Sequence, residues 1–173
     1  MIIEPTKAYD YLILARDRLF EWVRPLSPAE YTREFPFGRR SIARTLTHIL
    51  ASEWYYVHRI GGHAVPEYAQ WPIREEEAPV FAGLVKAWAE QAERTRAAIA
   101  AVRDWKAEIE YRVTDDDGRP MLVTATRGDV FTQLVLHKVH HRAQAMSTLR
   151  HLGIAAADLD FNALTFRRRR AHA

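Results

Sequence analysis

The most informative segment for predicting the fold lies near the C-terminal end of the chain, where residues 126–153 read TRGDVFTQLVLHKVHHRAQAMSTLRHLG. Thr126 and Asp129 have the spacing of a helix N-terminal capping box, and Gly153 is typical of the position just after a helix end. Between these ends, apolar residues recur at intervals of three and four, which indicates one apolar face. The stretch therefore predicts a long helix that ends near Leu152-Gly153.

Three further helices are predicted upstream from the same spacing of apolar residues. Thr6 can cap the first, and Pro25 stops it because proline lacks an N–H. Ser41 can cap the second, and Gly61-Gly62 ends it. Pro79 suits the first turn of the third. The expected spans are about 6–24, 42–60 and 80–104.

The connections between these helices have patterns of their own. From Ile109 to Ala125, apolar and polar residues alternate on both sides of a turn at Asp115–Gly118, which predicts a short β-hairpin. The stretch His63–Ala78 contains two prolines and the acidic run Glu75–Glu77, and we interpret it as a surface connection. The apolar segment Leu159–Phe166 is expected to pack back on the body of the protein.

Four long amphipathic helices in 173 residues indicate an all-α fold, a four-helix bundle with a small β-hairpin before the last long helix. We expect a single domain over residues 1–166, followed by a disordered basic tail at residues 167–173. The formal net charge is +3, and the run Arg167–Arg170 supplies four of the positive charges. The body of the protein therefore gives no general case for nucleic-acid binding.

Composition excludes several classes of protein. The chain has no cysteine, which excludes disulfides, thiolate metal sites and cysteine nucleophiles. The N-terminus carries Glu4, Pro5 and Asp10 where a signal peptide needs an apolar run. No apolar stretch approaches the ~20 residues that span a bilayer. We therefore expect a cytoplasmic protein without membrane contact.

The histidines are the residues that indicate a possible chemical function. His137 and His141 are four residues apart, so both side chains leave the same face of the last helix, which is expected to be buried. Two imidazoles at this spacing can meet one metal ion, although a hydrogen-bonded or exposed pair is the plainer interpretation. His48 is the candidate third ligand, because Thr45 and Ser52 beside it suit the wall of a wet cavity. The rim of the bundle is the alternative for that face.

Other polar residues are candidates to support such a site or to line its pocket. Gln133 and Gln144 share the face of the last helix that carries the two histidines, although both can also be ordinary polar residues at the bundle edge. Glu53 interrupts the apolar stripe of the second helix, where a lone carboxylate is costly. It can act as a proton acceptor or as the hydrogen-bond partner of a metal-ligating residue, but an ion pair with an arginine such as Arg142 or Arg44 is the simpler account.

These segments resemble a known family. Residues 136–144, LHKVHHRAQ, followed by LRHLG at 149–153, resemble the signature of the DinB family. The segments THILA at 47–51, EWYY at 53–56 and DLDF at 158–161 are also similar to that family. The order of elements matches over nearly the whole chain.

The resemblance implies a DinB/YfiT-like four-helix bundle in up-down-down-up order, a fold whose members often form homodimers. It implies that the metal ligands are His48, His137 and His141, and that His140 lies beside the site. Ala143 stands where the family usually has glycine, and this change should not remove a ligand.

A site of three histidines leaves one metal position open to water or substrate. We expect a divalent transition metal such as Zn, Ni or Fe, because imidazole suits all of them. The resemblance implies a thiol-dependent S-transferase or isomerase that acts with a low-molecular-weight thiol, and a hydrolase using metal-bound water is the nearby alternative. Two other hypotheses stay open: a non-catalytic, stress-associated metal-binding dimer (a sensor or scaffold), and a metal-free bundle with vestigial histidines.

Overall fold

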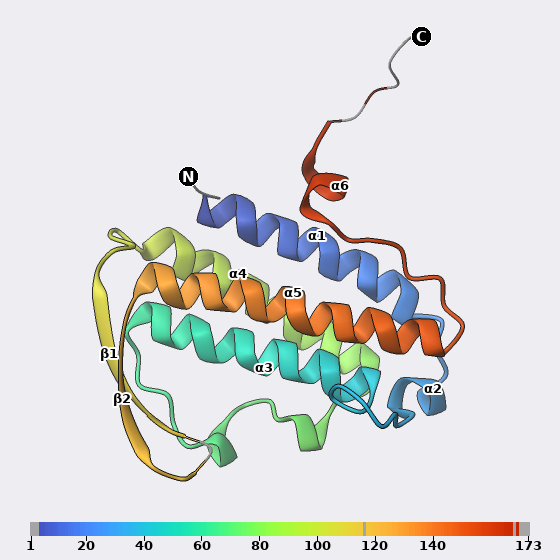
Figure 1. Ribbon diagram of the computed structural model, residues 1–173, viewed down its shortest axis with the longest axis horizontal. Coiled ribbons are helices and arrows are strands. Elements are labelled where there is room, and N and C mark those ends of the chain that lie inside the picture. Colours follow the sequence, from blue (N-terminus) through green and yellow to red (C-terminus); the bar gives the residue numbers. More distant parts are fainter. Residues whose placement is uncertain (1–3, 116, 168, 170–173) are drawn as a thin grey trace.

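The computed structural model describes residues 4–115, 117–167 and 169 of a mostly helical chain with one small hairpin before the last long helix (Figure 1). The predicted basic tail lies largely outside these residues. The long helices are α1 (Pro5–Val23), α3 (Ile42–Gly61), α4 (Phe81–Ala101) and α5 (Arg127–His151). The short elements are α2 (Pro28–Thr32), η1 (Tyr68–Gln70), η2 (Glu75–Glu77), β1 (Glu108–Thr114), β2 (Pro120–Thr126) and α6 (Phe161–Thr165).

The start of α5 and both ends of α3 are those that the sequence predicts. The Thr126 hydroxyl accepts a hydrogen bond from the N–H of Asp129 at 3.0 Å, and the Asp129 carboxylate accepts one from the N–H of Thr126 at 3.0 Å. Ser41 caps α3 by accepting the N–H of Arg44 at 3.1 Å. Gly62 follows α3 with φ 73°, a left-handed conformation that favours glycine because it has no Cβ.

Two helices start within one residue of their predicted positions but with other residues at their ends than those expected, and the third long helix stops at Ala101, three residues before its predicted end. Glu4 caps α1 in place of Thr6, because the Glu4 carboxylate accepts two first-turn N–H groups at 3.0 and 2.9 Å. Pro5 then occupies the first helical position, where its missing N–H costs nothing. The third long helix begins at Phe81 and excludes Pro79, because the residue between them has extended backbone angles (φ −57°, ψ 150°).

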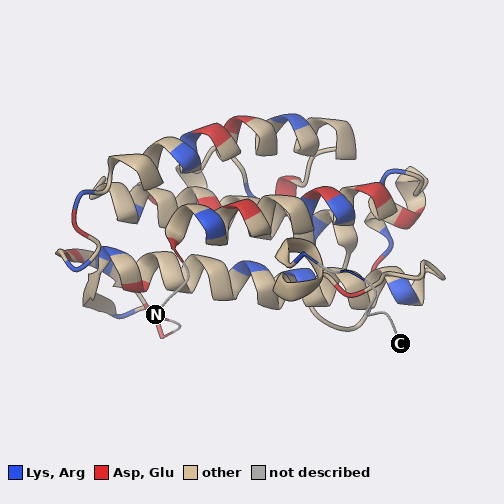
Figure 2. Ribbon diagram, turned by 90° about the horizontal axis from the view of Figure 1, so that it is seen from above, with Lys and Arg blue, Asp and Glu red and all other residues tan. Residues whose placement is uncertain are grey.

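The long helices lie side by side (Figure 1). Both α3 and α1 pack against α4 and α5. The strands β1 and β2 pair antiparallel, with Glu108 opposite Thr126 and Thr114 opposite Pro120, and they curve around one end of the helices. Acidic and basic residues are interspersed over the helices (Figure 2). No helix in the described part of the chain has the length and apolar character that crossing a membrane requires.

The core lies where the four long helices meet, and the C-terminal segment covers part of it. Leu159 is buried, and its carbonyl accepts a hydrogen bond from the Tyr11 hydroxyl at 2.8 Å. The Phe161 ring packs edge-on against Tyr11 with ring centres 5.1 Å apart. The predicted return of this segment to the body is therefore confirmed. Fully buried apolar side chains come from every long helix: Tyr9, Leu19, Leu46, Ile60, Leu84, Trp88, Leu134 and Leu149.

One carboxylate inside this core joins all four long helices. Glu53 on α3 is fully buried and accepts hydrogen bonds from Tyr9 of α1 at 2.5 Å, and from Thr95 and Trp88 of α4 at 2.7 and 3.1 Å. Lys138 of α5 completes the set with an ion pair. Burial opposes ionisation, but Lys138 and the hydrogen bonds outweigh it and hold the pKa of Glu53 below its ordinary value. Glu53 is therefore a charged structural centre.

The prediction that Glu53 forms an ion pair is thus correct, but its partner is Lys138 and not Arg142 or Arg44. Arg142, one turn beyond Lys138 on α5, donates to the Tyr11 hydroxyl. Arg44 lies near the start of α3, about two and a half turns before Glu53, and makes no ion pair with it. Lys138 was harder to identify as the partner from the sequence, because it lies in the histidine-rich part of α5, next to His137.

We expect Lys138→Met to lower the free energy of unfolding by about 3–5 kcal/mol, because it leaves the Glu53 charge buried without its counter-ion. Urea denaturation followed by circular dichroism measures the loss. Arg96→Met is the matched control, since it breaks the exposed Arg96–Asp10 pair and should cost less than about 1 kcal/mol. Equal losses in the two variants would contradict a structural role for the buried pair.

Candidate metal centre

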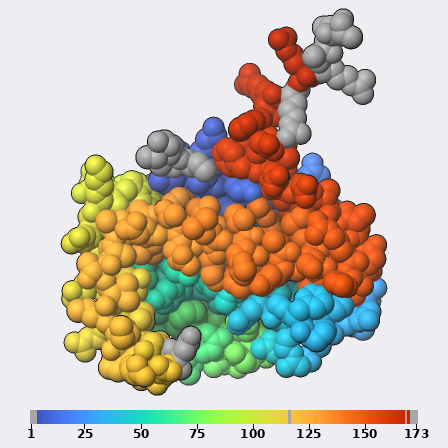
Figure 3. Space-filling view, in the orientation of Figure 1, coloured from blue at the N-terminus to red at the C-terminus, as the bar shows by residue number. Residues whose placement is uncertain are grey.

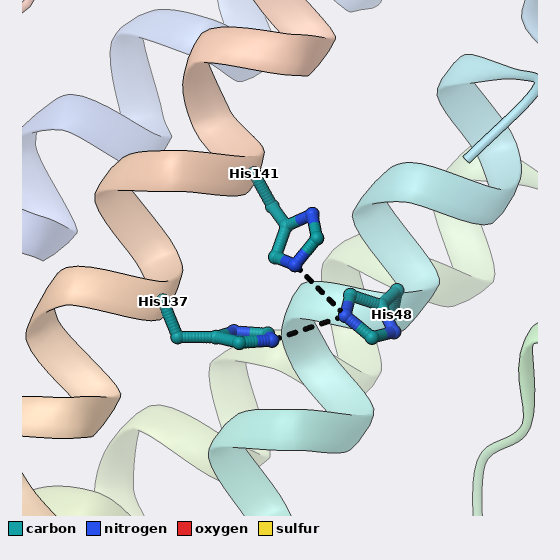
Figure 4. A group of neighbouring side chains, drawn as sticks. All are labelled: His48, His137 and His141. Carbon is teal, nitrogen blue, oxygen red and sulfur yellow. Dashed lines mark hydrogen bonds between the residues drawn. The ribbon is translucent and has the colours of Figure 1, made fainter. Parts of the chain in front are cut away.

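Three histidines from two helices converge at the seam between α3 and α5. His48 comes from α3, and His137 and His141 come from successive turns of α5 (Figure 4). The Nε2 atom of His48 lies 3.0 Å from Nε2 of His137 and 3.1 Å from Nε2 of His141. All three side chains are partly buried, and their ligand atoms lie within 4.8 Å of one another. Among the described residues, this is the one cluster of histidine and acidic groups with such spacing.

In His48 and His141, the hydrogen-bond partner of the outward-facing Nδ1 atom indicates that this nitrogen carries a proton. Nδ1 of His48 lies 2.7 Å from a carboxylate oxygen of Glu75, and Nδ1 of His141 lies 2.7 Å from the amide oxygen of Gln144. Both oxygens can only accept hydrogen bonds, so each Nδ1 carries a proton. In the neutral rings the two Nε2 atoms then present lone pairs to each other at 3.1 Å. Two facing lone pairs repel, and a cation between them removes that repulsion.

The spacing also fits a metal ion. Tetrahedral zinc with bonds of ~2.0–2.1 Å to imidazole places neighbouring nitrogens about 3.3 Å apart, a few tenths of an ångström more than the distances here. The ligands must also be neutral, since a protonated imidazole cannot bind a metal. Burial, followed by the nearby His141 and His48, lowers the pKa of His137 to about 3. Burial also lowers the pKa of His141. The residues present therefore fit a divalent transition metal.

His137 differs from the other two rings in its surroundings. Its Nδ1 is buried and has no hydrogen-bond partner in the described part of the protein. Its ring instead packs edge-on against Tyr56 of α3, with ring centres 5.6 Å apart. The position of His137 therefore depends on packing, whereas hydrogen bonds orient His48 and His141.

Glu75 is the residue of the site that the sequence analysis missed. It lies in η2, within the segment interpreted as a surface connection, yet it is buried against α3. Arg39 donates to both of its carboxylate oxygens, and its N–H donates to the Tyr68 hydroxyl at 3.3 Å. Burial alone would raise the pKa of Glu75, but the hydrogen bonds from His48 and Arg39 outweigh burial and hold the pKa at about 2. Glu75 is therefore an ionised acceptor for His48.

No sequence signal separates Glu75 from the two glutamates that follow it. Glu76 and Glu77 are exposed, and both have the same side chain in the same acidic run. Only the packing of the η2 turn on α3 makes the first of the three different. The surface interpretation of this segment is correct for most of it and wrong for Glu75.

The other candidate residues lie at different distances from the histidines. Gln144 contacts His141 directly, while Gln133 is exposed and hydrogen bonds to Tyr56. Ser52 lies one turn after His48 on α3 and is half-buried, without a hydrogen bond to any of the three rings in the described chain. Glu53 lies in the core and does not contact the cluster. Of the four candidates, Gln144 is the one that orients a candidate ligand.

Two neighbours on α5 lie outside the cluster. His140 is exposed, and its Nε2 lies 3.0 Å from the amide nitrogen of Gln144, which donates to it. His140 therefore holds Gln144 with its oxygen toward His141. Ala143 is exposed, so the methyl group that replaces the expected glycine does not enter the site.

In Figure 3 the surface of α5, in orange, borders that of α3, in teal, on the face toward the viewer. Beside α3, the ring of Tyr55 stacks on that of Trp71 with ring centres 5.4 Å apart, and Tyr68 of η1 lies edge-on to Trp71 at 5.0 Å. Trp88, by contrast, is buried in the core.

Comparison with known proteins places the chain in a family. No curated protein matches it. The family model described as "DinB family" matches residues 1–169, nearly the whole chain. The match extends over both helices that carry the three histidines and over the hairpin between α4 and α5. The chain therefore belongs to the DinB family.

Proposed function

We propose that this protein is a metal-dependent enzyme in which Nε2 of His48, His137 and His141 hold one divalent transition metal. The observation that carries the proposal is the pair of Nε2 atoms of His48 and His141, which face each other at 3.1 Å while each Nδ1 lies 2.7 Å from an acceptor oxygen on its outer side. No carboxylate or fourth imidazole in the described chain completes the cluster. One position on the metal would therefore be open to a ligand, as in catalytic sites.

The protein's own residues would prepare this site in two ways. Glu75 keeps the His48 proton on Nδ1, and Arg39 keeps Glu75 ionised and in place. In the same way, the amide oxygen of Gln144 keeps the His141 proton on Nδ1, and His140 accepts a hydrogen bond from the Gln144 amide nitrogen. These contacts fix ring orientation and make the nitrogens facing the metal more basic.

We propose thiol-dependent group transfer as the reaction class. Three neutral imidazoles leave the charge of a divalent ion uncompensated, which favours an anionic additional ligand such as a thiolate. When bound, such an ion lowers the pKa of a coordinated thiol or water and so supplies a nucleophile near neutral pH. A hydrolase that uses water is the alternative within the same site. Homodimer formation and a cytoplasmic location stay predictions.

We also propose that the fold is the DinB/YfiT-like four-helix bundle with up-down-down-up order. The colours of Figure 1 support this order, because α1 and α5 run in one direction while α3 and α4 run in the other. The long connection that contains η1 and η2 allows α3 and α4 to run the same way, and it brings Glu75 to the histidines.

Protein purified without a histidine tag should contain about one transition-metal ion per chain, as measured by elemental analysis. His141→Ala should lose most of this metal while keeping its helical circular dichroism spectrum. His151→Ala, which removes an exposed histidine of the same helix, should retain it. Metal far below one equivalent after growth with zinc, nickel and iron in turn, together with a melting temperature that chelators do not change, would contradict the proposed site.

Glu75→Gln should weaken metal binding by about 10–100-fold, because a neutral amide holds the His48 proton less firmly than a carboxylate. Competition with a chromophoric zinc chelator measures the affinity. Glu77→Gln is the control, since it makes the same substitution two residues away at an exposed position. Equal affinities of Glu75→Gln and wild type would show that Glu75 does not support the ligand.

The metal-loaded protein should accelerate the reaction of a low-molecular-weight thiol with a soluble electrophile, and His141→Ala should lose this activity. Thiol consumption with a panel of thiols and electrophiles measures the rate. Ester hydrolysis without any thiol would favour the hydrolase instead. A metal-loaded protein that accelerates neither reaction would favour a binding or sensing role.

A further inference from the structure

A second polar feature lies on α3, away from the histidines. Arg59 is 8% exposed, yet no carboxylate among the described residues forms an ion pair with it. Its Nη2 donates to the backbone carbonyl of Arg112 at 3.3 Å. Its Nε is buried and has no partner in the described chain. A buried guanidinium without an anion is costly, and cations of this kind are normally paired.

Two aromatic rings hold the guanidinium. The central carbon of the Arg59 guanidinium lies 5.0 Å from the ring centre of Tyr55 and 4.4 Å from that of Tyr111. Such contacts offset part of the cost of burial and fix the plane of the group. Apart from the Arg112 carbonyl, the N–H groups of the guanidinium have no hydrogen-bond acceptor in the described part of the chain. Carboxylates bind arginine through these in-plane donors.

Arg59 also lines a cavity of about 470 Å³ between the end of α3, the residues that follow it and the hairpin. The apolar side chains of Val65, Ile109 and Leu122 and the ring of Tyr111 line part of this cavity, together with the polar side chains of His63 and Arg112. Glu110 lines the cavity as well, but it makes no ion pair with Arg59 in the described chain. A cavity that combines apolar side chains with a buried cation lacking a carboxylate partner suits a ligand with an apolar body and one anionic group.

We propose that this cavity binds a small organic carboxylate with an apolar or aromatic body, and that Arg59 is the residue that recognises the carboxylate. The site does not share a residue with the proposed metal centre. It lies on the same face of α3, because the 11 residues from His48 to Arg59 make just over three full turns and a rise of about 16.5 Å. The carboxylate site therefore goes beyond the metal-dependent reaction and does not require it.

The test uses the full-length protein and a pair of matched probes, 3-(4-fluorophenyl)propionate and its neutral primary amide. Fluorine NMR titration measures the affinity of each. The carboxylate should bind at least about tenfold more tightly than the amide, because a hydrogen bond to a charged group is lost in the amide. In the same samples, the Nε–H signal of Arg59 in a proton–nitrogen spectrum should shift with the carboxylate and not with the amide.

Two variants separate specific recognition from general charge. Arg59→Met should weaken carboxylate binding by at least about tenfold and leave amide binding unchanged, and Arg59→Lys should fall between wild type and Arg59→Met. Arg112→Met removes a cation that lines the same cavity and keeps the carbonyl that Arg59 contacts, so its effect should stay within about threefold.

Several results would overturn the proposal. These are equal affinities for acid and amide, an Arg59 signal that does not respond to the acid, and no binding of the acid at millimolar concentration. An Arg112→Met loss as large as that of Arg59→Met would also overturn it, because general charge would then explain the binding. If Arg59→Met does not fold, the two probes and the Arg59 signal in the wild-type protein decide the question alone.

Discussion

The contact between α3 and α5 depends on one buried charge pair, Glu53 with Lys138. Because Glu53 also accepts hydrogen bonds from α1 and α4, a single carboxylate sets the register of all four long helices. His48 lies five residues before Glu53, and His137 directly precedes Lys138. The same register that pairs the buried charges therefore brings the histidines of the two helices together at the outer seam.

The site at that seam is built by four segments of the chain. Two helices supply the rings, and the connection after α3 supplies Glu75 as the acceptor for one of them. Arg39, from the segment before α3, holds that acceptor in turn. Each contact removes one orientation that an imidazole could otherwise take. The result is a set of Nε2 atoms that face one another across the seam, an arrangement that a cation stabilises.

Local sequence signals predicted the fold well where the relevant contacts are themselves local. The capping box of Thr126 and Asp129 and the spacing of His137 and His141 are examples, since both depend on neighbouring turns of one helix. Contacts between residues that are far apart in the sequence were harder to predict from it. The sequence marks Glu53 as unusual but does not show that Lys138 faces it.

Glu75 shows the limit most clearly. Its burial depends on how a turn without regular periodicity packs against α3, and three identical residues in a row give no sign of which one faces inward. The resemblance to the DinB family indicated the three histidines, but it did not supply the groups that orient them. Arg59 is similar, because only the three-dimensional structure shows that no carboxylate among the described residues forms an ion pair with it.

X-ray absorption spectroscopy at the zinc edge tests the central claim most directly, using zinc-loaded protein purified without a tag. Three imidazole nitrogens at about 2.0 Å, with the outer-ring scattering typical of histidine, are the expected result. A zinc environment with one imidazole or none would contradict convergence of the two helices on a single cation.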